Sequence, residues 1–290
     1  MRRLLSLSAW TLGYVVANQV AVVVVQNLAQ PGSGGLDAYA KAYIFFVLPH
    51  GLLAMSIVTT FTPDLARSVQ KRDKPAFVER ASLGIRLIAL LTFPAAAGMF
   101  VLRSPLIGMV LQHGKFDEID TIVTSRALAG FSVGLVGFSV YLFVLRGFYA
   151  HGDARTPFVI NLVENLVNVL LAFALVDRYG VLGLGLAFAI AYLVSALWAL
   201  QVMSYKLRGF PIRATLVAFG KMLAAAAVMA EVTWLVSRAV GGNAGLAAVA
   251  RVTAAGIAGL VAYGVALAVL RVPEVGHLRR RLVRRNATTT

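Results

Sequence analysis

Eight apolar stretches, separated by polar connections, constrain this chain more than any other feature. They lie near residues 9–28, 38–61, 83–102, 128–145, 158–176, 182–203, 216–236 and 246–270. The hydrocarbon core of a bilayer is about 30 Å thick, and a helix rising about 1.5 Å per residue needs about 20 apolar residues to cross it. Each stretch is long enough. The sequence therefore predicts an all-α, polytopic membrane bundle of about eight transmembrane helices.

The composition excludes several classes of protein. Hydrophobic residues make up 59% of the chain and charged residues only 13%, which is unlike a soluble domain. The net charge of +15 lies mainly in the connections and in a tail, so we expect anionic membrane lipid, and not nucleic acid, as its partner. The chain has no cysteine, which excludes disulfides, a thiol nucleophile and any cysteine-based metal site.

The distribution of the basic residues predicts an orientation. Of the 27 Lys and Arg residues, 19 lie in segments on the same side of the membrane as the N-terminus, seven on the other side, and Lys221 within a span. Basic residues concentrate in cytoplasmic loops. We therefore expect a multi-pass protein of the plasma membrane with both termini in the cytoplasm. Residues 1–270 would form the transmembrane domain and 271–290 a basic cytoplasmic tail.

The fifth stretch carries the clearest candidate site. Asn161, Glu164, Asn165 and Asn168 fall at positions i, i+3, i+4 and i+7, which places their side chains on one face of a helix. A carboxylate with three amides offers oxygen ligands suited to a hard cation or a proton. The alternative is a polar seam that joins this helix to a neighbour through hydrogen bonds. The sequence leaves both interpretations open.

Other polar residues within spans are more ambiguous. Lys41 and Arg86 lie near the ends of the second and third stretches, where each could reach the interface or face an anionic headgroup in a cavity. For Asn18 and Gln26 in the first stretch we favour hydrogen bonds between helices. Pro49, followed by His50 and Gly51, indicates an irregular helix of the kind that lines cavities in transporters.

Small residues within the spans indicate close helix packing. Glycine allows two helix backbones to approach each other. The positions concerned are Gly130, Gly134, Gly137, Gly183, Gly185, Gly256 and Gly259.

No catalytic constellation is recognisable. The four histidines are scattered without metal-ligand spacing, and no GxxxxGK[ST] loop is present to cradle a nucleotide phosphate. The sequence therefore predicts a carrier or a scaffold: not an enzyme, with no catalytic residues, no metal site and no resident cofactor.

Three segments resemble the MurJ (MviN) lipid II flippases. Residues 111–116, LQHGKF, continue to Arg126 in a segment similar to the family's (F/L)QxGKF…T…RAL pattern. Residues 147–157, GFYAHGDARTP, resemble its FYAxGDxRTP loop, and the segments LPHG at 48–51 and TPDL at 62–65 resemble its P-x-G…(L/F)P-x-L stretch. The residues of the first two motifs that we single out are Gly114, Lys115, Phe116, Arg126, Asp153, Arg155, Thr156 and Pro157.

The resemblance implies one lobe of a transporter of the MOP exporter superfamily. Such flippases have fourteen spans, and this chain is similar to spans seven to fourteen, so we expect a fragment or the product of a split or truncated gene. The resemblance implies export of lipid II, on an undecaprenyl- or decaprenyl-type carrier, by alternating access during cell-wall synthesis. It further implies an apolar groove for the lipid tail at the last two spans, 216–236 and 246–270.

The resemblance also implies a cation site, for Na⁺ or H⁺, among the helices that correspond to the first, fifth and sixth spans. Asn161, Glu164, Asn165 and Asn168 are the candidate ligands. One family arginine aligns with Ile44, which leaves Lys41 as the nearest basic side chain for a headgroup.

Partners and rivals follow from the same resemblance. Besides lipid II, we expect the N-terminal lobe or a cytoplasmic regulatory domain as partners, and anionic lipid for the arginine-rich tail; a simple topological anchor is the alternative for that tail. The rival functions are export of another polyprenyl-linked saccharide or of a drug, and a scaffold for cell-wall enzymes that does not transport.

Overall fold

The computed structural model describes residues 2–29, 34–207, 209–272 and 274, and in these residues it is a bundle of helices without strands. Eight helical segments are long and apolar enough to cross a membrane, which confirms the predicted class. The elements are α1 (Arg2–Leu28), α2 (Gly35–Pro49), the π-helical turn η1 (His50–Ala54), α3 (Met55–Gln70), α4 (Lys74–Leu111), α5 (Glu118–Ala150), α6 (Arg155–Tyr179), α7 (Val181–Lys206), α8 (Ile212–Val240) and α9 (Gly245–Val269).

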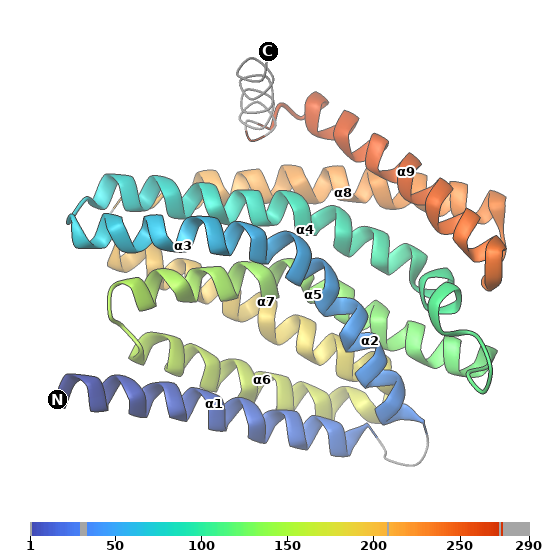
Figure 1. The fold of residues 1–290 in the computed structure, drawn as a ribbon, viewed down its shortest axis with the longest axis horizontal. Coiled ribbons are helices and arrows are strands. Elements are labelled where there is room, and N and C mark those ends of the chain that lie inside the picture. The colour runs from blue at the N-terminus through green and yellow to red at the C-terminus, as the bar shows by residue number, and fades with distance from the viewer. Residues whose placement is uncertain (1, 30–33, 208, 273, 275–290) are drawn as a thin grey trace.

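Successive spans run antiparallel, so the connections gather at two ends of the bundle (Figure 1). We call the end where α1 begins the basic end. The connections between α3 and α4, between α5 and α6 and between α7 and α8 also lie there. Helix α5 occupies the centre and packs against α7, α4 and α2. Helices α1 and α6 flank it on one side, and α8 and α9 on the other (Figure 1).

Aromatic side chains fill the centre of the bundle where α2, α5 and α7 meet. Phe46 of α2 lies 5.4 Å from the ring centroid of Phe131 and 5.2 Å from that of Phe138, both on α5. The Phe188 ring of α7 stands edge-on to Phe46 at 5.4 Å. Tilted and edge-on pairs of this kind are favourable beyond the area that they bury. This core fixes α2 and α7 against α5.

Glycines let α5 approach α7 closely, as the sequence predicts. A Cβ atom added to Gly130 or Gly134 would lie 2.6–2.8 Å from backbone atoms of α7, closer than real contacts allow. A Cβ at Gly259 of α9 would meet the hydroxyl of Thr233 on α8. At Gly256, by contrast, nothing lies within 4 Å, so the expectation of close packing is wrong at this position.

The helices extend further than the hydropathy pattern predicts. The segment 62–82, expected to be a polar loop, is helical except at residues 71–73, and most of 103–124 is helical as well. The reason is that apolar content marks where a helix crosses the membrane, whereas capping marks where it ends. The Asp73 carboxylate accepts a hydrogen bond from the backbone N–H of Ala76 at 3.0 Å and starts α4. Asp117 and Asp120 form a capping box that starts α5.

The irregularity expected at Pro49 is a π-helical turn. Helices α2 and α3 form one continuous span, and η1 widens it at residues 50–54. Proline cannot donate a backbone hydrogen bond, and a π turn accommodates the displaced carbonyls. Nδ1 of His50 lies 3.0 Å from the hydroxyl oxygen of Ser139, which ties this turn to α5. Helix α4 continues without interruption through Pro94.

Little of the predicted tail is covered by the structure. Of residues 271–290, only Arg271, Val272 and Glu274 are described. The arginine-rich part at Arg279, Arg280, Arg281, Arg284 and Arg285 lies outside the described residues.

Candidate functional site

The four polar residues singled out on α6 share one buried face. Asn161 and Glu164 are 0% and 1% exposed, and Asn165 and Asn168 are each 7% exposed. These four residues are called the polar seam below. Helix α6 turns the seam inward because the residues on its opposite side, such as Leu162 and Leu166, are apolar and exposed to the surroundings of the bundle. The spacing of 3, 4 and 7 positions predicted this arrangement.

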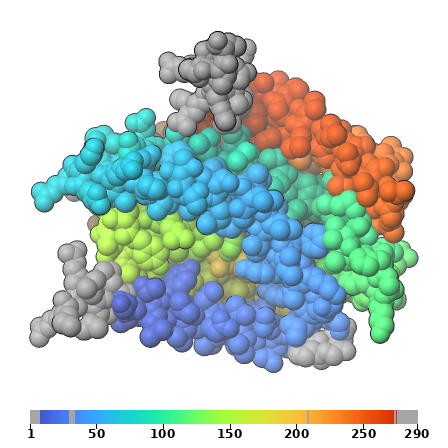
Figure 2. Space-filling model, viewed as in Figure 1, coloured from blue at the N-terminus to red at the C-terminus, as the bar shows by residue number. Residues whose placement is uncertain are grey.

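The polar seam borders a cavity of about 300 Å³ enclosed by α1, α2, α6 and α7. Glu164, Asn165 and Asn168 line it from α6, and Asn18 and Gln26 line it from α1. Asn18 and Gln26 were expected to join helices through hydrogen bonds, and the structure places both on the wall of this seam cavity. Figure 2 shows the surface hollowed between α1 and α2, with α7 visible at its base.

Several seam atoms are buried without a hydrogen-bond partner. They are both carboxylate oxygens of Glu164, the amide oxygen and nitrogen of Asn161, and the amide oxygen of Asn168. Asn165 differs, because its amide nitrogen donates to the backbone carbonyl of Asn161 at 2.9 Å. Buried polar atoms are normally paired. Unpaired oxygens on three adjacent side chains form a donor set that a hard cation or a proton would satisfy.

Three tyrosines line the seam cavity together with Glu164. They are Tyr39 and Tyr43 of α2 and Tyr192 of α7, and Tyr192 is 7% exposed. Sequence reasoning missed these tyrosines. No spacing signal reveals them, because they meet the seam only through tertiary packing.

Lys41 does not line the seam cavity; it pairs within its own helix. Its ammonium group forms an ion pair with Asp37, one turn earlier on α2. It also lies 4.6 Å from the ring centroid of Phe116, in the connection between α4 and α5. Ile44, the position that aligns with a family arginine, does line the cavity. The wall contributed by α2 is therefore apolar where the resemblance implies a cation.

Arg86 is neutralised by a residue far along the chain. Its Nε lies 3.1 Å from a carboxylate oxygen of Glu274, and the Glu274 side chain is 2% exposed. The partly exposed Arg86 cation is paired with a buried carboxylate, so it offers little charge to a further anion. The sequence could not indicate this partner, which lies 188 positions away at the end of the described chain.

The motif between α4 and α5 forms a tight turn. Gly114 has a φ of 63°, a left-handed conformation that favours glycine, and Lys115 beside it is exposed. Phe116 packs under Lys41. Arg126, just before the apolar part of α5, is exposed and borders a small cavity at this end of the bundle.

The motif between α5 and α6 is held together by Asp153. Its carboxylate accepts hydrogen bonds from the Thr156 backbone N–H at 3.0 Å, from the Thr156 hydroxyl at 2.7 Å and from Lys206 of α7 at 2.5 Å. Burial by itself would raise the pKa of Asp153, but the bonds from Lys206 and Thr156 outweigh it and lower this pKa overall. Arg155 lies over the Trp10 ring of α1, with its guanidinium carbon 5.9 Å from the centroid. Pro157 is buried in the first turn of α6.

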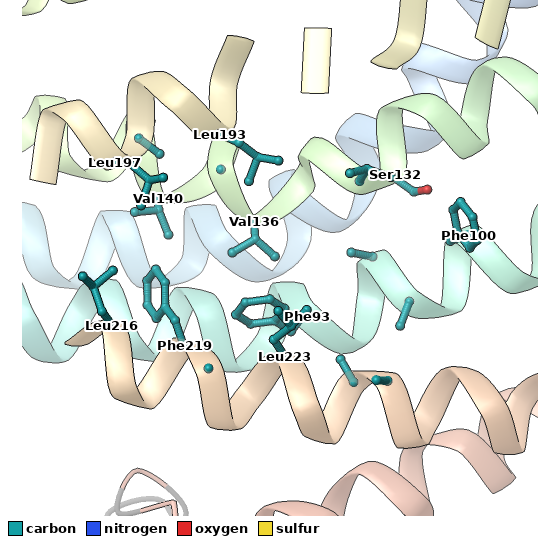
Figure 3. A pocket seen from close by; sticks show the side chains of 18 of the residues that line it. Phe93, Phe100, Ser132, Val136, Val140, Leu193, Leu197, Leu216, Phe219 and Leu223 are labelled. Carbon is teal, nitrogen blue, oxygen red and sulfur yellow. The ribbon is translucent and has the colours of Figure 1, made fainter. Parts of the chain in front are cut away.

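A second and larger cavity lies elsewhere in the bundle and is apolar. It measures about 550 Å³ and is enclosed by α4, α5, α7 and α8. Figure 3 shows Phe93, Val136 and Phe219 on its walls, and Ser132 as its one labelled polar side chain. The Ser132 hydroxyl already donates to the Ala129 carbonyl at 2.9 Å. The groove implied for the lipid tail was expected between the last two spans, whereas α8 borders this cavity without α9.

Among the described residues, no three His, Asp or Glu side chains cluster as metal ligands would.

Comparisons with known proteins identify relatives over most of the chain. The family model described as "Lipid II flippase MurJ" matches residues 1–252. The chain is 28% identical over 169 residues to the lipid II flippase MurJ of Thermosipho africanus, covering 58% of this chain and 34% of that protein. It is 28% identical over 251 residues to the probable lipid II flippase MurJ of a Synechocystis species, covering 84% and 47%. The chain thus spans about a third to a half of the length of these curated relatives.

Two solved structures share the fold. A lipid II flippase MurJ in an inward closed conformation matches with a TM-score of 0.72 and 24% identity, covering 89% of this chain and 52% of that one. A point mutant of the Vibrio cholerae MATE transporter VcmN matches with a TM-score of 0.61 and 15% identity, covering 96% and 68%.

Proposed function

The chain belongs to the MurJ family of lipid II flippases, and from this premise we propose that it forms one lobe of a transporter for lipid-linked peptidoglycan precursor. The transported headgroup, a pyrophosphate with sugars and a peptide, cannot cross hydrocarbon unaided because its polar groups would lose their hydration. A lobe that alternates between two arrangements would offer this headgroup a polar path while the polyprenyl tail stays in lipid. Transport of this kind involves no covalent chemistry by the chain.

The observation that carries the proposal is the set of unpaired oxygens on the polar seam. Glu164 and Asn168 line the seam cavity, and Asn161 lies one turn before Glu164 on the same buried face. Their unpaired oxygens supply what a coupled cation needs. A cation that binds one arrangement of the lobe better than the other shifts the equilibrium between them by its difference in affinity. We propose that Na⁺ or H⁺ binds at the seam as a co-substrate and drives the change of arrangement.

The proposal includes an orientation in the bacterial plasma membrane. Lys71 and Arg72 between α3 and α4, and Lys206 at the end of α7, lie at the basic end of the bundle. Positive charge favours the cytoplasmic side. We place the basic end, and with it both termini, in the cytoplasm, and the connection at 112–117 outside.

The part of the family's fold that this chain does not cover would have to complete the transport path. The chain covers 52% of the matching flippase structure, so about half of that protein lies outside the match. We propose that an N-terminal lobe faces the seam-cavity side of this chain, either within a longer polypeptide or as a separate one.

Two alternatives make different predictions. An exporter of another polyprenyl-linked saccharide or of a drug would use the same fold, which the MATE likeness also has. A scaffold for cell-wall enzymes would insert in the membrane and transport nothing. The substrate and the need for Glu164 separate these alternatives from a lipid II flippase.

The test is export of lipid II in cells depleted of their own flippase, with lipid II measured in the outer leaflet. The chain is expressed alone and together with the N-terminal lobe of the Synechocystis relative, which aligns over 84% of this chain. Both forms are repeated with Glu164→Gln and with the control Glu231→Gln, whose side chain on α8 is exposed and lies outside both large cavities.

We expect export by the paired form, at least a tenfold loss with Glu164→Gln and less than a twofold change with Glu231→Gln. Export that is insensitive to Glu164→Gln would remove the seam from the mechanism. Stable insertion without lipid II export in any pairing would contradict the flippase proposal and favour the scaffold.

A further inference from the structure

A small pocket at the basic end of the bundle contains a charged side chain, that of Arg146. This residue belongs to α5, the most buried helix. Between Thr124 and Ala150, α5 exposes only four side chains. Val133 borders the apolar cavity and Arg126 the cavity at the opposite end. The other two, Arg146 and Tyr149, lie one turn apart and open into a separate pocket of about 180 Å³. We call it the Arg146 pocket.

Three helices build the Arg146 pocket. Tyr14 lines it from α1, Met55 and Val58 from α3, and Leu142 and Leu145 from α5, together with Arg146 and Tyr149. In Figure 2 the surface of this end of α5 is visible between α1 and α3. Its walls are apolar except for one guanidinium and two phenol groups, and no carboxylate of the described residues lines it.

The Arg146 side chain differs from its neighbours in having no anionic or hydrogen-bonded partner among the described residues. Arg155 lies over Trp10, and Lys206 pairs with Asp153. Arg80 donates to the Asp64 carbonyl and to the Ser68 hydroxyl. No ion pair, hydrogen bond or ring contact engages the Arg146 guanidinium within the described chain. A charged side chain beside apolar walls calls for a partner of opposite charge.

The chemistry of the pocket matches a phosphate group. A planar guanidinium forms two parallel hydrogen bonds to phosphate oxygens, and it does so better than an ammonium group. The Tyr149 and Tyr14 hydroxyls can donate further bonds. A volume of 180 Å³ corresponds to about six waters at about 30 Å³ each, which leaves room for a phosphate or a pyrophosphate.

We propose that Arg146, with Tyr149 and Tyr14, forms a phosphate-binding site between α1, α3 and α5 at the basic end of the bundle. A membrane offers such a phosphate group from two sources, the pyrophosphate of a polyprenyl-linked substrate and the headgroup of an anionic phospholipid. The first source rests on the proposed function, whereas the second does not. Neither Lys41 nor Arg86 can serve in its place, because each is paired with a carboxylate.

The experiment measures phosphate binding to the full chain in phosphatidylcholine nanodiscs. In one arm undecaprenyl pyrophosphate is added, and in the other phosphatidylglycerol is incorporated; lipid retained by the protein is quantified by mass spectrometry. Arg146→Gln, Arg146→Lys and Tyr149→Phe are compared with Arg213→Gln. Arg213 is the matched control, an exposed arginine at the basic end of α8 that does not line the pocket.

We expect Arg146→Gln to weaken retention at least tenfold, Tyr149→Phe two- to fivefold and Arg213→Gln less than twofold. Arg146→Lys should fall between wild type and Arg146→Gln, because it keeps the charge and loses the paired bonds. Loss confined to undecaprenyl pyrophosphate assigns the site to the substrate, and loss in both arms assigns it to membrane phosphate generally. Equal retention by Arg146→Gln and Arg213→Gln in both arms would overturn the site.

Folding and the proposed function are controlled separately. Each variant must elute as a single species and unfold at the wild-type temperature; if Arg146→Gln does not, Arg146→Lys and Tyr149→Phe decide the result. Glu164→Gln is measured alongside. It should retain undecaprenyl pyrophosphate like wild type, so failure of the cation site and failure of the phosphate site give different outcomes.

Discussion

The seam cavity occupies about 300 Å³ between α1, α2, α6 and α7, whereas the apolar cavity occupies about 550 Å³ between α4, α5, α7 and α8. The seam cavity contains a carboxylate and an amide oxygen that have no hydrogen-bond partners. The polar side chain labelled in the apolar cavity is Ser132, and its hydroxyl already donates a hydrogen bond. An apolar cavity forms at little free-energy cost in a bundle whose helices carry small residues. Burying a polar atom without a hydrogen-bond partner costs much more free energy, so such atoms locate the site better than cavity volume does.

The largest difference in stability should appear when a carboxylate is placed in the apolar cavity instead of the seam cavity. Val136 is 7% exposed on the wall of the apolar cavity, and none of the residues that line this cavity is charged. Val136→Glu should therefore destabilise the folded chain by about 3 kcal/mol or more. Glu164→Gln in the seam keeps the volume and should change stability by less than about 1 kcal/mol. Unfolding of both variants in detergent checks this. Equal tolerance of both changes would contradict the distinction between the cavities.

Within the seam, the four residues should differ according to their existing bonds. Asn168 has a free amide oxygen, whereas Asn165 already donates to the Asn161 carbonyl. We expect Asn168→Ala to weaken cation binding about fivefold, which is roughly 1 kcal/mol, and Asn165→Ala to affect stability more than binding. Cation titrations of the two variants separate these effects. The reverse ranking would exclude the Asn168 oxygen as a ligand.

The start of the seam helix should depend on pH through Asp153. The pKa of this carboxyl is lowered below its ordinary value of 3.8, so its contribution to stability is present above that pH and is lost as the pH falls through the lower, folded-state value. Asp153→Asn should cost about 1–3 kcal/mol at pH 7 through the weakened bonds to Thr156 and Lys206. The difference from wild type should shrink near pH 3. A difference independent of pH would show that charge is not involved.

The smallest effect is expected from filling the apolar cavity. Ala227 of α8 lines it and is exposed, so Ala227→Phe can enter the space without displacing a buried side chain. Cation binding at the seam should change less than twofold, because α8 does not border the seam cavity. A large loss of cation binding would mean that the two cavities are coupled through α7, which borders both.

Local patterns in the sequence predicted the features of the fold and the site that depend on helix geometry alone. Apolar length predicted the spans, and the spacing of Asn161, Glu164, Asn165 and Asn168 predicted their common face. Hydropathy underestimated α4, which begins at an Asp73 cap and continues beyond the apolar stretch at both ends. Caps and membrane thickness are independent constraints, and only the second is visible in an apolar run.

Tertiary neighbours could not be predicted in the same way. Nothing near Arg86 indicates Glu274 as its partner, and nothing near Glu164 indicates Tyr43 or Tyr192 on the wall of the same cavity. The apolar stretch at 128–145 ends just before Arg146, yet α5 continues past this residue to Ala150 and carries it into a pocket. These relationships depend on which helix faces which, and a single sequence does not encode them in any periodicity.

Cation binding at the polar seam should appear as cation-dependent stabilisation of the purified chain. Unfolding is measured while Na⁺ replaces choline at constant ionic strength, and separately over a range of pH without Na⁺, for wild type, Glu164→Gln and Glu231→Gln. A bound cation should stabilise wild type and Glu231→Gln by about 2.7 kcal/mol at a hundredfold excess over its Kd, and Glu164→Gln should lose this gain. An identical response of wild type and Glu164→Gln to both Na⁺ and pH would contradict cation binding at the seam.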